Sequence, residues 1–169
     1  MTIRAIVASD LSSLQAISRK TFTETFADTN TEDNLTKYLD TAYALDKLLL
    51  EFNNPDSKFF FAELDGQVVG YLKVNFGASQ TELNDHSSLE IERIYVLKEF
   101  HGAKVGQALY QKALDIAKEN AVNYLWLGVW EENHRALSFY KKNGFVEFDK
   151  HLFKLGEDVQ TDLMMKLVL

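Results

Sequence analysis

The sequence predicts an α/β protein, a mixed sheet with helices on both faces, folded as one domain over residues 1–169. Strand-like and helical spacing of apolar residues alternate in the order β, helices, ββ, β, α, β, α, ββ. Strand–helix–strand units require parallel neighbours, whereas hairpins require antiparallel ones, so the sheet must be mixed. A chain of 169 residues with 46% hydrophobic content suffices for one core, and it contains no linker-like segment.

The first third of the chain predicts one strand followed by helices. Alternation over residues 2–7 indicates a strand, and Ser9 and Asp10 are predicted to cap the helix of "SDLSSLQAISRKTF". Thr31 can cap a second helical segment. Helical spacing then continues as far as Pro55, the only proline, which we expect to end this helical region.

A hairpin is predicted next, because the pair Asp65-Gly66 separates the two strand-like runs "KFFFAEL" and "VVGYLKV". The polar residues 77–87 are expected to form a surface loop. "SLEIERIYV" is the following predicted strand, and a helix with one apolar face is predicted from about Ala103 to Asn120.

The last third predicts a strand, a helix and two strands. "NYLWLGVW" is typical of a largely buried strand. "NHRALSFYKKNGF" predicts a helix that Asn133 caps and that Asn143-Gly144 ends. Two terminal strands, around "FVEFDKHLFKL" and "TDLMMKLVL", complete the predicted sheet.

The composition argues against several classes of partner and site. The formal net charge is −7 without a basic run, which disfavours a nucleic-acid partner. No window approaches the roughly 18 apolar residues of a membrane helix, and residues 1–4 lead into strand-like sequence instead of a signal peptide. We therefore expect a cytoplasmic protein without a membrane partner. There is no cysteine, and the four histidines lack ligand-like spacing, so we expect no metal site.

The stretch "IERIYVLKEFHGAKVGQALYQKAL" runs from an apolar strand through a short turn with a glycine into an amphipathic helix. Free N–H groups at a helix start add to the helix dipole and can bind a pyrophosphate. Gly102, Ala103 and Gly106 would allow close approach, and Lys104 adds a positive charge. Alternatively, Gly102 only ends the loop and Gly106 only eases helix packing. Neither G-x-x-x-x-G-K-[ST] nor G-x-G-x-x-G is present, which disfavours a kinase-type phosphate loop and a dinucleotide fold.

A second pattern lies further downstream in "NHRALSFYKKNGF", where Asn133, Ala136 and Tyr140 recur at helical spacing. With both patterns together, the whole chain resembles the GCN5-related N-acetyltransferase (GNAT) superfamily. It looks most similar to the bacterial PaiA-type polyamine acetyltransferases, in "FTETF", "LEIERIYV", "WLGVWE", "FYKKNGF" and "QTDLMM". The resemblance implies a mostly antiparallel twisted sheet of about seven strands with a central parallel splay.

The resemblance implies that acetyl-coenzyme A is the acetyl donor. The family's turn carries Q/R-x-x-G-x-G/A, and here "HGAKVG" has His101 in place of Gln or Arg and Lys104 in place of a glycine. Residues 94–96 would pair with the pantetheine arm as a neighbouring strand does, and Asn133 would contact the cofactor. The implied cofactor residues are Ile94, Tyr95, Val96, His101, Gly102, Ala103, Lys104, Val105, Gly106, Gln107, Asn133, Ala136, Tyr140 and Lys142.

Acetyl transfer to an amine requires a base, a polarised thioester carbonyl and a proton for the departing thiolate. Glu90 and Glu92 are predicted to share one face of their strand. Similarity to spermidine-type members favours Glu92 as the base, our first prediction, and similarity to histone-type members favours Glu90. Tyr140 matches the family's frequent general acid, and a backbone amide near Val96 would polarise the carbonyl. The alternatives are solvated or ion-paired carboxylates, and a core tyrosine packed beside Phe139.

The expected acceptor is a small-molecule amine, spermidine or spermine. Carboxylates combined with aromatic rings suit a long polycation, and the predicted acceptor residues are Phe22, Glu24, Phe26, Asp28, Trp130 and Glu131. One alternative is acetylation of peptide N-termini or lysines. Another is a non-catalytic acyl-coenzyme A sensor, which the departures at His101 and Lys104 would favour. Members of the family are often dimers, so a homodimer is also an open alternative.

Overall fold

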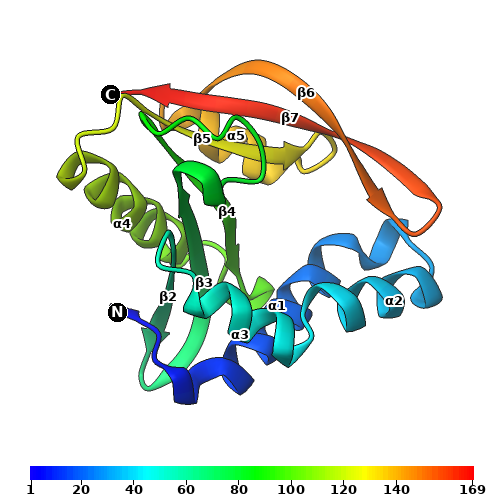
Figure 1. The fold of residues 1–169 in the computed structure, drawn as a ribbon. Coiled ribbons are helices and arrows are strands. Elements are labelled where there is room, and N and C mark those ends of the chain that lie inside the picture. Colours follow the sequence, from blue (N-terminus) through cyan, green and yellow to red (C-terminus); the bar gives the residue numbers. More distant parts are fainter.

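The computed structural model describes residues 1–169, and its seven strands form one sheet in the order β1-β2-β3-β4-β5-β7-β6. The strands are β1 (Thr2–Ala5), β2 (Ser57–Leu64), β3 (Gln67–Phe76), β4 (Ser88–Val96), β5 (Tyr124–Trp130), β6 (Val146–Leu155) and β7 (Asp158–Val168). All neighbours are antiparallel except β4 and β5. The predicted mixed, mostly antiparallel sheet is therefore confirmed (Figure 1).

Helices cover both faces of this sheet (Figure 1). They are α1 (Leu11–Phe26), α2 (Glu32–Ala42), α3 (Leu45–Asn53), α4 (Val105–Glu119) and α5 (His134–Lys142). One core lies under α4 and α5, and a second lies under α1, α2 and α3. Adjacent strand residues supply both cores, since successive side chains point to opposite faces: Leu72 packs in the first core and Tyr71 in the second. None of the helices combines the length and hydropathy that crossing a membrane requires.

Two local predictions hold in the structure. Asp65 and Gly66 connect β2 to β3 with φ angles of 49° and 79°, as a hairpin turn with two left-handed residues requires. Thr31 caps α2, because its side chain accepts the N–H of Asn34 at 3.1 Å.

The start of α1 differs from the prediction. The Asp10 carboxylate does not cap the helix. It accepts the backbone N–H of Val7 at 2.8 Å and pairs with the Arg4 guanidinium at 2.8 Å. A charged, bidentate partner stabilises a carboxylate more than a neutral helix N–H does, so the ion pair prevails. The helical stretch that was predicted as far as Pro55 is also divided, because Ala44 is extended between α2 and α3.

The sheet opens in its middle. Strands β4 and β5 pair only over residues 88–90 and 124–126, although β4 continues to Val96 and β5 to Trp130. Beyond these pairs the two strands diverge, and residues 91–96 of β4 and 127–130 of β5 form a wedge with Glu90 and Trp126 at its narrow end. The edge of β4 that faces β5 therefore has no strand partner beyond Glu90.

A bulge lies beside this opening. Lys73 pairs with Arg93 and Val74 with Ile91, so Glu92 is an extra residue in β4. Side-chain alternation shifts by one residue at that point. As a result Glu92 and Arg93 both point toward the side of α3, where both Arg93 and Lys73 pair with Glu51.

Candidate active site

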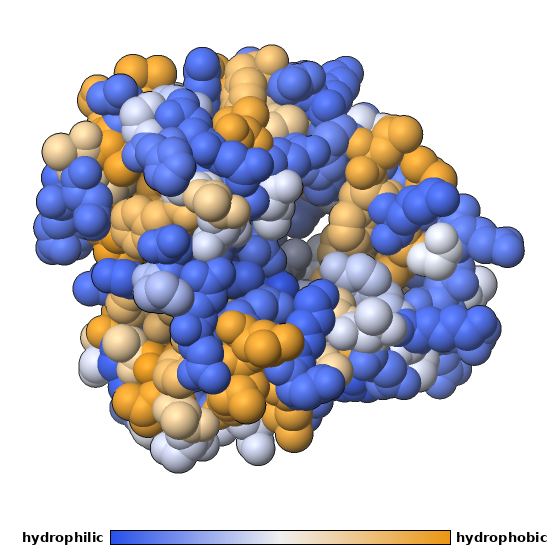
Figure 2. Space-filling view, viewed as in Figure 1, coloured by the Kyte–Doolittle hydropathy of each residue, from blue (hydrophilic) through white to orange (hydrophobic).

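A cleft of about 930 Å³ occupies the wedge between β4 and β5, and its volume falls in the range of small-molecule sites. Its walls come from α1, β4, β5, the start of α4, α5 and the β6/β7 hairpin. Figure 2 shows a hollow on this face of the molecule, between β4 and the β6/β7 hairpin. The splay of the central strands therefore creates this cleft. All the implied cofactor residues except Ala103 line it.

The start of α4 presents free hydrogen-bond donors to the cleft. The first helical bond joins the N–H of Ala108 to the carbonyl of Lys104, and the N–H groups of residues 104–107 have no backbone partner. No side chain caps them. Four unpaired N–H groups at the positive end of a helix dipole can bind an anion such as a pyrophosphate.

Lys104 adopts a conformation that glycine adopts easily. Its φ is 64°, in the left-handed region, and Gly102 in the same turn has a φ of 87°. Position 104 is one of the two at which the chain departs from the expected turn pattern. The backbone geometry there is nevertheless the one a glycine would permit.

His101, the other departure, closes the turn with its side chain. Its Nε2 lies 3.0 Å from the carbonyl oxygen of Val96, so the imidazole ties the turn to the end of β4. Gln107 ties the start of α4 to the end of α5, since its Nε2 donates to Asn143 Oδ1 at 3.3 Å.

Helix α5 contributes Asn133 and Tyr140 to the cleft. Asn133 caps the helix by accepting the N–H of Ala136 at 3.2 Å, as predicted, and its side-chain NH₂ has no partner within the chain. Tyr140 is 7% exposed and packs against Phe139 and Phe145. Its hydroxyl makes no hydrogen bond within the chain, and burial raises its pKa. The phenol is thus kept protonated and free to donate.

Glu90 lies at the narrow end of the wedge and is 3% exposed. Its Oε1 accepts the backbone N–H of Thr81 at 2.8 Å and Asn75 Nδ2 at 2.9 Å, and its Oε2 accepts the Thr81 hydroxyl. Burial raises the pKa of Glu90, and the hydrogen bonds from Thr81 and Asn75 offset part of that rise. The carboxyl group therefore binds a proton more readily than an ordinary glutamate.

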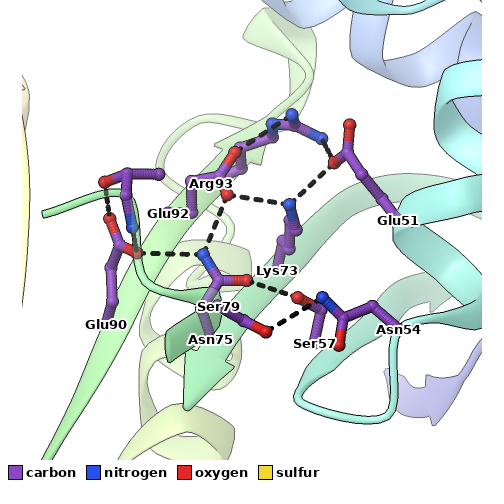
Figure 3. Close-up of polar contacts among 10 residues, drawn as sticks. Glu51, Asn54, Ser57, Lys73, Asn75, Ser79, Glu90, Glu92 and Arg93 are labelled. Atoms are coloured by element: carbon purple, nitrogen blue, oxygen red, sulfur yellow. Dashed lines mark hydrogen bonds and ion pairs between the residues drawn. The ribbon is translucent and has the colours of Figure 1, made fainter. Parts of the chain in front are cut away.

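Glu92 has the opposite surroundings (Figure 3). Its Oε1 lies 2.7 Å from Lys73 Nζ and 2.8 Å from Asn75 Nδ2, and its Oε2 lies 3.0 Å from Arg93 Nη2. Burial alone would raise the pKa of Glu92, but the charges of Arg93 and Lys73 outweigh it and lower the pKa to about 2. This carboxylate stays ionised and is fully engaged in ion pairs.

Glu51 of α3 completes the ion-pair network. It contacts Lys73 Nζ at 2.7 Å and Arg93 Nη1 at 2.9 Å. Two cations are thus matched by two carboxylates, Glu51 and Glu92 (Figure 3). Glu90, which shares the face of Glu92 as predicted, has no cationic partner.

The predicted acceptor residues divide into two groups. Phe22, Glu24, Phe26 and Trp130 line the cleft, and Glu24 Oε1 accepts the N–H of Lys98 at 3.0 Å. Asp28 and Glu131 are exposed and are not part of its lining.

The wall of the cleft also has an aromatic and acidic part that the sequence did not predict. Tyr38 and Phe153 line the cleft, with ring centroids 5.7 Å apart, and Phe26 stacks on Phe153. Asp162 and His151 lie beside them, with His151 Nε2 3.2 Å from Asp162 Oδ2. Burial raises the pKa of Asp162. These residues come from α2, β6 and β7, so only the folded chain brings them together.

The residues that surround Glu90 were also missed. Thr81 lies in the loop 77–87, which the sequence predicted only as a polar surface segment. Lys73 and Asn75 could have been predicted as site residues, because they are two polar residues at alternate positions of a largely apolar strand.

The sequence model of the Acetyltransferase (GNAT) family matches residues 13–145. The chain belongs to this family. The predicted resemblance is confirmed, and the protein is an acyltransferase whose family uses acetyl-coenzyme A as acetyl donor.

Individual relatives agree with this GNAT identity. An uncharacterized N-acetyltransferase of Lactobacillus delbrueckii subsp. lactis is 42% identical over 160 residues, which cover 95% of this chain and 92% of that protein. The spermidine N(1)-acetyltransferase of Thermoplasma acidophilum is 29% identical over 147 residues, 85% of this chain and 86% of that protein. The crystal structure of PaiA N-acetyltransferase from the same organism, in complex with coenzyme A, superposes with a TM-score of 0.82 at 26% identity and covers 100% of both chains.

Proposed function

We propose that this GNAT protein transfers the acetyl group of acetyl-coenzyme A to a primary amine of spermidine or spermine. One observation carries the proposal: a single cleft contains the free N–H groups at the start of α4, the buried Glu90 and the protonated Tyr140. The N–H groups would bind the donor, and the two side chains supply the base and the acid that the reaction requires. The name of the Thermoplasma spermidine N(1)-acetyltransferase supports the polyamine acceptor.

In this proposal the pyrophosphate of the donor is held by the N–H groups of residues 104–107. The unpaired edge of β4 beyond Glu90 pairs with the pantetheine arm in the place that a strand would occupy. The free NH₂ of Asn133 adds a donor from the other side of the wedge. Each contact uses a group that the fold leaves without a partner.

We assign the base to Glu90 and place Glu92 second, reversing the order that resemblance to spermidine-type members favours. The raised pKa of Glu90 suits a group that must accept a proton near neutral pH. Glu92 has a pKa of about 2 and two cationic partners, so it is a weak base. Its proposed role is to keep Lys73 and Arg93 neutralised beside the site.

Glu90 and Tyr140 carry out the two proton transfers of the proposed reaction. Glu90 takes a proton from the amine, directly or through a water molecule, as the nitrogen bonds to the acetyl carbon. A backbone N–H near Val96 polarises the thioester carbonyl. When the carbon–sulfur bond breaks, Tyr140 donates its proton to the departing thiolate, and solvent restores both groups afterwards. The raised pKa of Tyr140 ensures that the proton is present at neutral pH.

The acceptor would lie against the wall formed by Phe26, Tyr38, Trp130, Phe153 and Asp162. Flat aromatic faces attract ammonium groups and cover methylene chains, and the partly buried carboxyl group of Asp162 would supply a counter-charge. Such a surface fits an extended aliphatic polycation.

An amine panel with thiol detection tests the proposal. Purified protein and acetyl-coenzyme A are incubated with spermidine, spermine, lysine peptides, free peptide N-termini and small aromatic amines. Thiol release is expected on the polyamines. Release on peptides alone would overturn the polyamine acceptor while retaining acetyl transfer. Binding of acetyl-coenzyme A in calorimetry without thiol release on any amine would instead indicate a non-catalytic acyl-coenzyme A sensor.

The cytoplasmic location and the homodimer remain predictions.

A further inference from the structure

We propose that Asn75 is a positioning residue for the base Glu90, assisted by Thr81. This inference rests on the proposed function, in which Glu90 accepts the proton of the amine. It assigns a role to a buried amide that lies behind the cleft and is not part of its lining.

Hydrogen bonds to both the oxygen and the nitrogen of the Asn75 side-chain amide determine its orientation. The residue is 0% exposed, and its Oδ1 accepts the hydroxyl of Ser57 at 2.8 Å. Its Nδ2 donates to Glu90 Oε1 at 2.9 Å and to Glu92 Oε1 at 2.8 Å (Figure 3). The reversed amide would direct its oxygen at two carboxylates, so only one orientation satisfies these partners.

Asn75 also links the base to a fixed framework. The two hydrogens of its amide hold the carboxylates of Glu90 and Glu92, which would otherwise repel each other. Glu92 is itself anchored by Lys73 and Arg93. Glu90 is therefore held relative to an ion-pair network that packs against α3, and not only by its own strand.

Thr81 fixes the remaining freedom of the carboxyl group. Its backbone N–H donates to Glu90 Oε1 and its hydroxyl donates to Oε2. Oε1 thus accepts two hydrogen bonds and Oε2 accepts one, so Oε2 retains an acceptor site. The geometry points to Oε2 as the atom that receives the proton.

Charged side chains lie on the elements around Glu90. Burial is the largest influence on the pKa of Glu90, and repulsion from Glu92 raises it further. The titratable and charged side chains on the neighbouring elements are Glu51 of α3, Lys73 of β3, Glu92 and Arg93 of β4, His151 of β6 and Asp162 of β7.

The test is Asn75→Leu, which removes the donor at similar volume. A donor to a carboxylate stabilises its ionised form, so its removal should raise the pKa of Glu90 by roughly one unit. Carbon-13 NMR of labelled glutamate carboxyl groups follows this titration, with Glu90 assigned by its loss in Glu90→Gln. The acid limb of kcat, measured with a weakly basic amine, should move upward by the same amount, while KM for acetyl-coenzyme A stays unchanged.

Two further variants keep the test decisive. Thr81→Val replaces the hydroxyl with a methyl group and should also raise the pKa of Glu90. If Asn75→Leu does not fold, this variant tests whether these hydrogen bonds set the acidity of Glu90. Asn54→Leu is the matched control, because the Asn54 amide bonds Ser79 at 2.9 Å and does not touch Glu90. It should leave the Glu90 titration in place.

An unchanged Glu90 titration in folded Asn75→Leu and Thr81→Val would overturn the positioning role. Loss of activity at every pH without a displaced limb would also overturn it, because a purely structural residue behaves in that way. The titration needs no turnover, so absence of acetyl transfer by the wild-type protein would contradict the proposed function separately.

Discussion

Glu90 and Glu92 lie on one face of β4, two residues apart, yet the structure gives them opposite acidities. Burial without a cation raises the pKa of Glu90, whereas Arg93 and Lys73 lower that of Glu92. Two similar carboxylates can thus serve different purposes, one in proton transfer and one in charge balance.

The first prediction compares the two glutamates. Glu90→Gln should lower kcat by about 100-fold or more, because it removes the proton acceptor while KM for acetyl-coenzyme A is retained. Glu92→Gln should instead lower the free energy of unfolding, because it leaves Lys73 and Arg93 short of one counter-charge. Thiol-release kinetics and urea unfolding measure both effects. A larger loss of kcat in Glu92→Gln with an undisturbed fold would return the base to Glu92.

The second prediction concerns the acid. Tyr140→Phe keeps the ring that packs against Phe139 and Phe145 and removes only a hydroxyl without a partner in the chain. The thermal unfolding midpoint should therefore change little, while kcat falls by about 100-fold. Steady-state kinetics with both substrates varied checks this outcome. If kcat and cofactor affinity fall together, Tyr140 serves packing instead of proton transfer.

Among the elements, α4 packs against β3 at Gly70, where there is no room for a larger side chain. A Cβ atom at that position would lie 2.9 Å from the Tyr95 carbonyl oxygen and 3.1 Å from Leu109 Cδ1. The close approach places the start of the helix at the mouth of the wedge. The position of the proposed phosphate site thus depends on a residue of β3.

The third prediction follows from this contact. Gly70→Ala should destabilise the fold by about 1–3 kcal/mol, because the backbone of β4 cannot yield to the added methyl group. Gly106→Ala is the matched control, since its Cβ would meet only Val96 Cγ2 at 3.9 Å. That variant should keep its stability and bind acetyl-coenzyme A more weakly, because the methyl group adjoins the free N–H groups. Urea unfolding and calorimetry separate the two cases.

Elements whose signals are local were predictable from the sequence, and those set by distant partners were not. The turn at Asp65-Gly66 and the cap at Thr31 follow from the residues themselves. Asp10 fails as a cap because its partner, Arg4, lies in β1. The bulge at Glu92 arises from the register of β4 against β3. The sequence of β4 alone does not determine that register.

The same distinction between local signals and distant partners applies to the residues of the site. The turn and the start of α4 are contiguous in the chain, so a phosphate-binding turn could be predicted there from the local sequence. The difference between Glu90 and Glu92 depends on Lys73, Asn75 and Thr81, which come from β3 and from the loop after it. Pairing of side chains across strands decides their acidity, and local sequence does not encode it.

At the scale of the whole molecule, the network around Glu92 couples stability to pH. The folded-state pKa of about 2 lies below the ordinary value of 4.5. A depressed carboxylate pKa adds stability above the unfolded-state value, and that contribution is lost as pH falls through the folded-state value. Glu90 acts in the opposite sense, because the cost of burying its charge disappears when it is protonated.

The fourth prediction is therefore acid destabilisation. Between about pH 4.5 and pH 2 the free energy of unfolding should lose roughly 3 kcal/mol from Glu92 alone. Glu92→Gln should start from a lower stability and show a weaker dependence on pH over the same interval. Urea titrations at several pH values measure both curves. Parallel curves for the two proteins would show that Glu92 is not the group responsible.

The short seam between β4 and β5 has a consequence for motion. Only three residue pairs join the four-stranded half of the sheet to the three-stranded half, so opening of the seam should be among the easiest fluctuations. Amide deuterium uptake should accordingly be rapid in the empty protein at those N–H groups of residues 91–96 that face β5. A bound pantetheine arm that supplies the absent neighbour should slow it, and the two halves would then behave as one continuous body only while the donor is held.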